Sequence, residues 1–161
     1  MTINEYNICV NTYSDDVYRF LLKQLGNEME AEDIVQNTFE KLWRNRETVF
    51  FDKAKSYLFT VAYRNMIDYT RRQKFVGSNE NMPEQRERDF EVQLEQREVL
   101  ELGLNQLSDI QKTLILLRDY EGYSYEEMAE MTELTISQVK VYLFRGRKKL
   151  QQFLKALDKV G

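Results

Sequence analysis

Residues 124–150 read SYEEMAEMTELTISQVKVYLFRGRKKL and contain two short helical patterns separated by about one turn of chain. Each pattern carries its own start signal. Ser124 with Glu127, and Thr135 with Gln138, form capping boxes, in which a hydroxyl accepts the N3 amide and the N3 side chain reaches back. The break falls at residues 132–134. A short helix, a tight turn and a longer helix are the layout of a DNA-reading helix-turn-helix.

The helix that follows Thr135 has two different faces. Its apolar residues recur every three or four positions and predict one buried stripe: Ile136, Val139, Leu143, Gly146, Leu150, Leu154 and Leu157. Because glycine weakens a helix, its place in this stripe predicts a close approach to a neighbouring helix. The opposite face carries Ser137, Lys140, Val141, Phe144, Arg145 and Lys148.

Positive charge is concentrated on this same helix. Between positions 138 and 155 there are six cations and no acid: Lys140, Arg145, Arg147, Lys148, Lys149 and Lys155. In a chain of net charge −4 this segregation indicates a surface for nucleic-acid phosphate. The alternative is a solvated cationic face near a helix C-terminus, which the helix dipole also favours.

Composition limits the classes of protein that the chain can belong to. The 161 residues include one Pro and six Gly, and 42% are hydrophobic, which favours helices with a core. There is no His, and Cys9 is the only Cys, so a Cys/His zinc site, an intrachain disulfide and histidine-based catalysis are excluded. No metal, cofactor or catalytic residue is expected. With no apolar run of membrane-spanning length and no signal-peptide pattern, a cytoplasmic location is expected.

Helical patterns also organise the first half of the chain. They cover residues 4–25, 31–46 and 56–72, and Ser14 with the two acids after it indicates a break inside the first. The second has a polar face of Asp33, Gln36, Asn37, Glu40 and Arg44, which is either solvated or docks a basic partner. The third interleaves aromatics with Arg64, Arg71 and Arg72, which suits single-stranded nucleic acid or a core helix with a basic tail. The loop at 47–54 holds Phe50 and Phe51, which either anchor the loop locally or stack on a partner; composition alone favours the anchor.

A polar, non-periodic segment separates the two halves. Residues 75–89 contain Gly77 and Pro83 and are predicted to be a flexible linker. After it, helices are expected at 90–107 and 109–120, the second starting at a capping box formed by Ser108 and Gln111. The predicted fold is all-α, with two small helical modules at 1–74 and 90–161 and the helix-turn-helix in the second.

Several stretches together resemble the small extracytoplasmic-function (ECF) sigma factors of bacterial RNA polymerase, in the sigma-70 family. YRFLL at 18–22, AEDIVQNTFEKLW at 31–43 and YLFTVA at 57–62 resemble that family's first module. LLRDYEGYSYEEMA at 116–129 and VKVYLFRGRKKL at 139–150 resemble its second. Two motif sets in the family's order, with a polar linker between them, are more specific than one helix-turn-helix alone.

The resemblance implies a role for each surface. It implies a promoter-recognition subunit whose partners are promoter DNA, an anti-sigma factor, and core RNA polymerase through the clamp helices of β′ and the flap of β. Polymerase docking falls on Asp33, Val35, Gln36, Asn37, Thr38 and Phe39. Capture and melting of the −10 element falls on Phe50, Phe51, Thr60, Arg64, Asn65, Asp68, Arg71 and Arg72, with Arg64 and Asn65 both candidates for the family's usual Asn. The family's contact positions for the −35 element correspond to Lys140, Val141, Phe144 and Arg145. The exposed face and the basic run add Ser137, Lys148 and Lys149 to the predicted DNA-binding residues.

Two other functions fit parts of the sequence. A stand-alone repressor would use the helix-turn-helix, but it would not need the Arg-aromatic first module. A helical interaction adaptor would leave the acid-free basic helix unexplained. An enzyme is disfavoured because there is no catalytic constellation and no Gly-rich phosphate loop.

Overall fold

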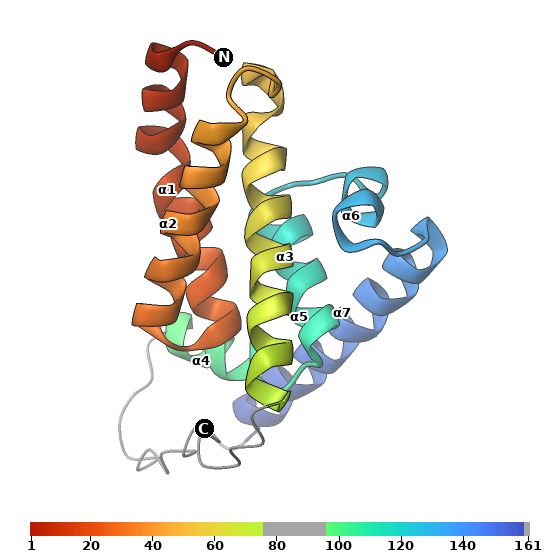
Figure 1. Cartoon of the computed structure of the whole chain (residues 1–161). Helices are drawn as coiled ribbons and strands as arrows, with labels where there is room; N and C mark the ends of the chain where they lie inside the picture. The colour runs from red at the N-terminus through yellow and green to blue at the C-terminus, as the bar shows by residue number, and fades with distance from the viewer. Residues whose placement is uncertain (76–95, 160–161) are drawn as a thin grey trace. The chain divides into compact units, whose positions relative to one another are not determined.

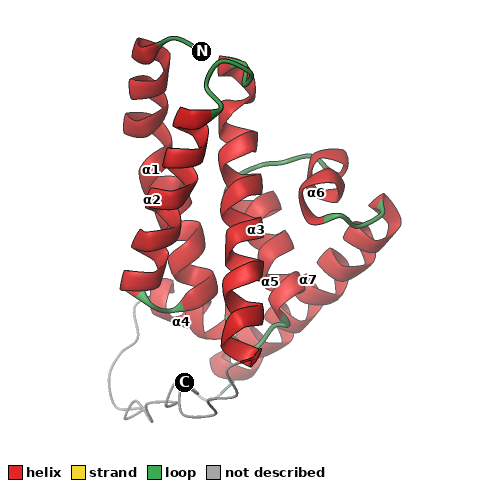
Figure 2. Cartoon of the chain, viewed as in Figure 1, coloured by secondary structure: helices red, strands yellow, loops and turns green. Residues whose placement is uncertain are grey.

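The computed structural model describes residues 1–75 and 96–159 (Figure 1). Within these residues the chain forms seven α-helices, one 3-10 turn and one π-helical segment, and Figure 2 shows no strand among them. The chain divides into two compact units, Met1–Gly77 and Ser78–Gly161. The all-α, two-module prediction is therefore confirmed. Most of the predicted linker, and the predicted helical residues 90–95, lie outside the described residues. No helix in the part that is described is both long and apolar enough to cross a bilayer.

The first unit begins with one long helix, α1 (Ile3–Leu25). Thr2 caps it through a capping box with Glu5, and Gly26 ends it at a φ of 67°. The break predicted near Ser14 was wrong, because the helix runs through that point without interruption. Its apolar positions keep one helical face across it, from Cys9 to Val17, and both of these side chains are buried. Asp15 lies exposed and pairs with Arg19 one turn later at 3.3 Å, so the acids are accommodated inside the helix.

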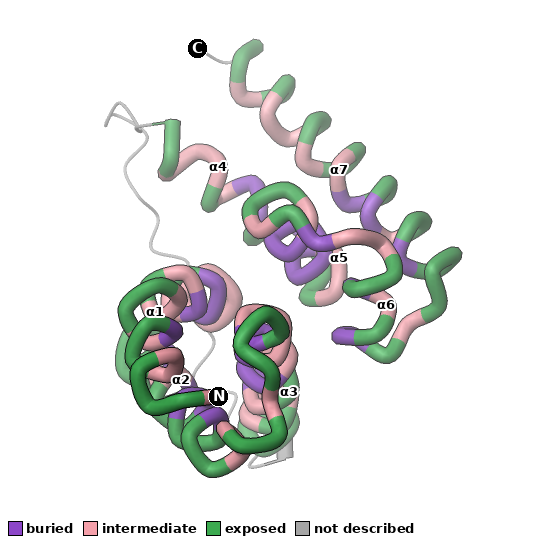
Figure 3. The backbone as a smooth tube through the Cα atoms, turned by 90° about the horizontal axis from the view of Figure 1, so that it is seen from above, coloured by how far each residue is buried: buried purple, intermediate pink, exposed green. Residues whose placement is uncertain are grey.

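Two further helices complete the three-helix core of this unit. They are α2 (Glu28–Arg44), capped by Asn27, and α3 (Ala54–Phe75), which starts two residues earlier and ends three residues later than predicted. Figure 3 shows the buried positions on the inward sides of α1, α2 and α3. Each helix contributes side chains with no exposed surface, and Phe20 meets Phe59 edge to face at 5.5 Å. The core is formed mainly by Val17, Leu21, Ala31, Leu42, Leu58, Phe59 and Ala62.

The second unit contains α4 (Gln96–Leu104), α5 (Asp109–Ile115), the π-helical segment η3 (Leu116–Tyr120), α6 (Tyr125–Thr132) and α7 (Ile136–Asp158). The three predicted capping boxes, at Ser108, Ser124 and Thr135, are all formed. The helix predicted at 109–120 does not stay α-helical, because its winding widens at Leu116. There the Glu121 amide donates to the Leu116 carbonyl five residues back, at 3.2 Å.

The long helix α7 packs against α5 at its glycine, as predicted. A Cβ at Gly146 would lie 3.1 Å from Gln111 Cβ and 3.3 Å from Ile115 Cδ1, so a larger residue would push the two helices apart. Val139 and Leu143 on the same stripe are buried. Ile136 was predicted in this stripe but is 40% exposed at the first residue of the helix.

Glu133 holds the turn between α6 and α7 in a left-handed conformation, with φ 59° and ψ 32°. Because this conformation costs an L-residue about 1 kcal/mol and glycine little, we expect Glu133→Gly to stabilise the chain by up to about 1 kcal/mol. The matched control is Glu130→Gly inside α6, which we expect to destabilise it by about 1 kcal/mol. Urea unfolding midpoints measure both effects. A fall in midpoint for Glu133→Gly would show that the side chain contributes more than its backbone costs.

Candidate nucleic-acid interface

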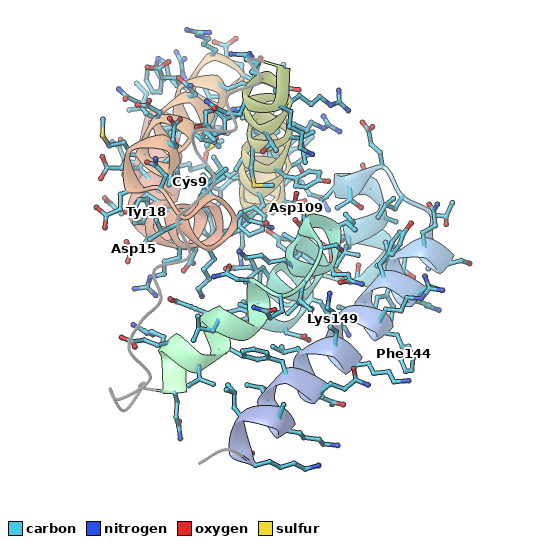
Figure 4. The ribbon with its side chains drawn as sticks, turned by 90° about the horizontal axis from the view of Figure 1, so that it is seen from below. Cys9, Asp15, Tyr18, Asp109, Phe144 and Lys149 are labelled. Atoms are coloured by element: carbon cyan, nitrogen blue, oxygen red, sulfur yellow. The ribbon has the colours of Figure 1, made fainter. Side chains whose placement is uncertain are left out.

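The outward face of α7 is a row of exposed cations and apolar groups near the start of the helix. All seven residues predicted to read DNA are exposed, and Phe144 and Val141 are 67% and 45% exposed. Figure 4 shows Phe144 projecting from α7 on the side away from α5. We call this surface the reading face: Ser137, Lys140, Val141, Phe144, Arg145, Lys148 and Lys149. Large apolar side chains beside cations can contact base edges and phosphates together.

Two contacts fix α7 against the elements before it. Arg147 forms a two-pronged ion pair with Asp119 of η3, with Nε donating to Oδ2 at 3.1 Å, and this bond raises the pKa of the guanidinium. Arg147 therefore braces the fold although it lies within the predicted basic run. Lys140 Nζ lies 5.5 Å from the centre of the Tyr125 ring, and the Arg118 guanidinium lies 4.8 Å from the same ring. This stack connects the first turn of α6 to the reading face.

In the first unit, the loop between α2 and α3 presents its aromatics to solvent. Phe50 is 76% exposed and Phe51 39% exposed, immediately before and within the 3-10 turn η1 (Phe51–Lys53). A phenylalanine this exposed contributes little to the stability of its own unit. Its exposure fits a residue that contacts a binding partner.

The remaining residues predicted for the −10 element lie along α3. Arg64, Asp68, Arg71 and Arg72 are exposed, whereas Thr60 and Asn65 are half-buried. The Thr60 hydroxyl donates to the Ser56 carbonyl at 2.7 Å. At 1.5 Å of rise per residue, Arg71 lies about 25 Å along the axis from the start of α3. The structure therefore places Phe50 and Phe51 at the loop and spreads the other six residues along α3.

The predicted docking residues on α2 divide between the surface and the core. Asp33, Gln36 and Asn37 are exposed, and Val35 is half-buried. Thr38 has no exposed surface and donates its hydroxyl to the Ile34 carbonyl at 2.7 Å, and Phe39 is 7% exposed. Thr38 and Phe39 therefore face the three-helix core, and the surface open to a partner is Asp33, Gln36 and Asn37. We call these three residues the docking face.

Two features of this site have no signal in the amino-acid sequence. The Asn45 side chain donates to the Tyr57 hydroxyl at 3.0 Å, which joins the two ends of the aromatic loop. The Arg46 guanidinium lies 4.0 Å above the Trp43 ring, which meets Tyr6 edge to face at 4.9 Å. Both contacts join residues through the tertiary fold or a turn, so no helical periodicity indicates them.

Comparison with known proteins shows which family shares this arrangement. Residues 9–76 match Sigma-70 region 2, and residues 97–150 match Sigma-70 region 4. The chain is 30% identical over 159 residues to the ECF RNA polymerase sigma factor SigM of Bacillus subtilis, covering 94% of each chain. It is 30% identical over 142 residues to the sigma factor SigV of the same organism, covering 87% of this chain and 85% of SigV.

A solved structure has the same fold. It is the co-crystal structure of the sigma factor RpoE with the anti-sigma factor NepR from Bartonella quintana. The TM-score is 0.78 at 23% sequence identity, covering 95% of this chain and 98% of that one. Two regional matches and a relative matched over nearly its whole length confirm the family resemblance. The chain therefore belongs to the ECF-type sigma-70 family, the non-catalytic sigma factors that initiate transcription with RNA polymerase.

Proposed function

We propose that the two units divide promoter recognition between them. In this proposal the reading face on α7 binds the −35 element in the major groove. The loop at 47–54, together with the exposed arginines of α3, captures and melts the −10 element. The observation that carries the proposal is that each unit has its own exposed aromatic side chain. Phe144 is 67% exposed on a helix face, which suits duplex DNA, and Phe50 is 76% exposed in a loop, which suits an unpaired base.

The chemistry of each surface supports this division. The N-terminal half of α7 carries cations and apolar groups on its exposed face. Such a face fits duplex DNA, where a helix reads base edges and thymine methyls in the major groove. A protruding loop phenylalanine fits an unpaired base, which offers an open ring face for stacking. A stand-alone repressor would not need the second kind of surface.

The proposed partners follow from the docking face and from the family to which the chain belongs. The docking face on α2 carries acidic and amide groups and would meet the clamp helices of the polymerase β′ subunit, while the second unit would contact the flap of β. We also propose that an anti-sigma factor regulates the chain, since RpoE of Bartonella quintana is seen with NepR. A subunit of RNA polymerase works where the polymerase is, so the proposed compartment is the cytoplasm.

Reconstitution tests this proposal directly. The chain is co-purified with core polymerase and used for run-off transcription on genomic fragments. We expect discrete starts whose upstream sequences share two elements spaced as −35 and −10. Stable binding to core without discrete starts would contradict the proposed promoter reading.

Reversing one charge on the docking face should weaken assembly with core polymerase. Because an exposed charge pair contributes at most about 1 kcal/mol, we expect Asp33→Lys to weaken binding roughly fivefold, mainly through a slower on-rate. The matched control is Glu32→Lys, which makes the same charge change one residue away on the neighbouring side of α2. Titration of each variant with core polymerase measures the effect, and circular dichroism checks helicity. Equal affinities for the two variants would show that the docking face lies elsewhere.

A further inference from the structure

We propose that Asn45 and Tyr57 are positioning residues that hold the loop at 45–53 ready to receive an unpaired base before DNA arrives. We call residues 45–53 the melting loop. This inference rests on the melting role proposed above for the loop at 47–54, of which the melting loop contains residues 47–53. It adds the residues that hold this loop in place.

Asn45 is the point at which the hydrogen bonds of the loop converge. Its carbonyl accepts from the Thr48 amide at 3.0 Å, the Val49 amide at 3.1 Å and the Thr48 hydroxyl at 3.0 Å. Its side-chain amide donates to the Lys41 carbonyl at 3.2 Å and to the Tyr57 hydroxyl at 3.0 Å. One residue therefore ends α2, closes the turn after it and reaches across to α3.

Tyr57 supplies the contact on the other side of the loop. It lies in the first turn of α3, twelve residues after Asn45, and its hydroxyl is the acceptor of the bond. Both side chains are half-buried, where a hydrogen bond competes less with water than it does on the open surface. The two ends of the melting loop are thus joined by side chains.

Phe50 lies between these fixed parts. Before it, the turn from Asn45 to Val49 is closed by the bonds to the Asn45 carbonyl. After it, the Lys53 amide donates to the Phe50 carbonyl at 3.0 Å and closes η1. The backbone around Phe50 is held although its ring is 76% exposed. Holding Phe50 in its binding conformation before DNA arrives lowers the conformational entropy lost on binding. The apparent affinity for an unpaired base therefore rises with the fraction of molecules whose loop already has that conformation.

A purely structural bond would behave differently from a positioning bond. Loss of a structural bond would lower the melting temperature of the unit and would reduce closed-complex affinity and opening rate alike. A positioning bond acts only through Phe50, so its loss should have no effect once Phe50 is gone. This coupling is measured by a double-mutant cycle.

The test uses holoenzyme, formed from the full chain and core polymerase, on a promoter fragment obtained by run-off selection and carrying 2-aminopurine in its −10 element. The variants are Tyr57→Phe, Asn45→Ala, Phe50→Ala and the Tyr57→Phe/Phe50→Ala double variant. The control is Tyr18→Phe, which removes a tyrosine hydroxyl on α1, near Glu28 and Glu32 at the far end of α2 from the loop (Figure 4). Closed-complex affinity, opening rate and thermal unfolding are measured for each.

We expect Tyr57→Phe, which removes the one hydrogen bond between the two side chains, to slow opening about threefold to tenfold with closed-complex affinity unchanged. Asn45→Ala removes that bond and the bond to the Lys41 carbonyl, so we expect it to slow opening at least as much. Tyr18→Phe should open at the parental rate. In the Phe50→Ala background, Tyr57→Phe should have no further effect.

Three results would overturn the inference. If Phe50→Ala slows opening and Tyr57→Phe does not, the positioning role is wrong while the melting role stands. If both slow opening and their effects multiply, Tyr57 does not act through Phe50. If Phe50→Ala opens normally, the melting role fails, and the positioning role fails with it.

Discussion

Replacing Phe50 and Phe51 with alanine should leave closed promoter complexes in place and slow strand opening by one to two orders of magnitude. Stacking of a base on an aromatic side chain contributes about 1–3 kcal/mol, and the alanine variant removes the stacking surface. Because Phe50 is 76% exposed and Phe51 39%, we expect Phe50→Ala alone to account for most of the loss. Permanganate reactivity of −10 thymines measures the opening.

The control for this experiment is Met29→Ala, which removes a large apolar side chain that is 77% exposed at the start of α2. It should open promoters normally when core polymerase is saturating. Undiminished thymine reactivity in the double alanine variant would mean that the two phenylalanines only anchor the loop.

Arg145→Ala should flatten the preference for the −35 element, whereas Lys149→Ala should weaken binding to all duplexes alike. An arginine on the reading face can pair with a guanine through two hydrogen bonds, and losing such a pair costs about 1–3 kcal/mol of discrimination. Lys149 lies one turn further along α7, where we expect contact with phosphate. Losing a phosphate contact lowers the slope of log affinity against log salt by about 1.

The measurement is binding of the two variants to cognate and scrambled −35 duplexes over a salt series. Each variant is the other's control, since both remove one exposed cation from the same helix. If Arg145→Ala lowers both affinities equally, Arg145 clamps the backbone and the specific reading comes from another residue of the reading face.

Much of the second unit could be predicted because its signals are local. Ser108, Ser124 and Thr135 cap their helices through residues three positions away, so the sequence alone shows where α5, α6 and α7 begin. Gly146 could be predicted to contact a neighbour because it interrupts an apolar stripe. The π-helical winding after Ile115 could not, since it depends on how the segment packs.

The predicted break in the first helix was wrong because a local start signal conflicted with the longer-range burial pattern. Ser14 with two acids resembles a helix start, but burial of Val17 and Leu21 on the face set by Cys9 keeps α1 continuous. The family motif includes Thr38 and Phe39, and both are buried, so the motif contains core positions of the three-helix unit. The Asn45–Tyr57 bond joins two helices across a loop, which no periodic pattern reveals.

The most direct test of the division between the two units is photocrosslinking from the two exposed aromatics. Phe50 and Phe144 are each replaced by the photoreactive amino acid p-benzoylphenylalanine, which keeps an aromatic ring at either site. The holoenzyme is then irradiated on a single promoter. We predict that the adduct from position 144 maps to the −35 duplex and the adduct from position 50 to an unpaired base of the −10 element. Adducts from both positions on the same element, or none from position 50, would contradict the account.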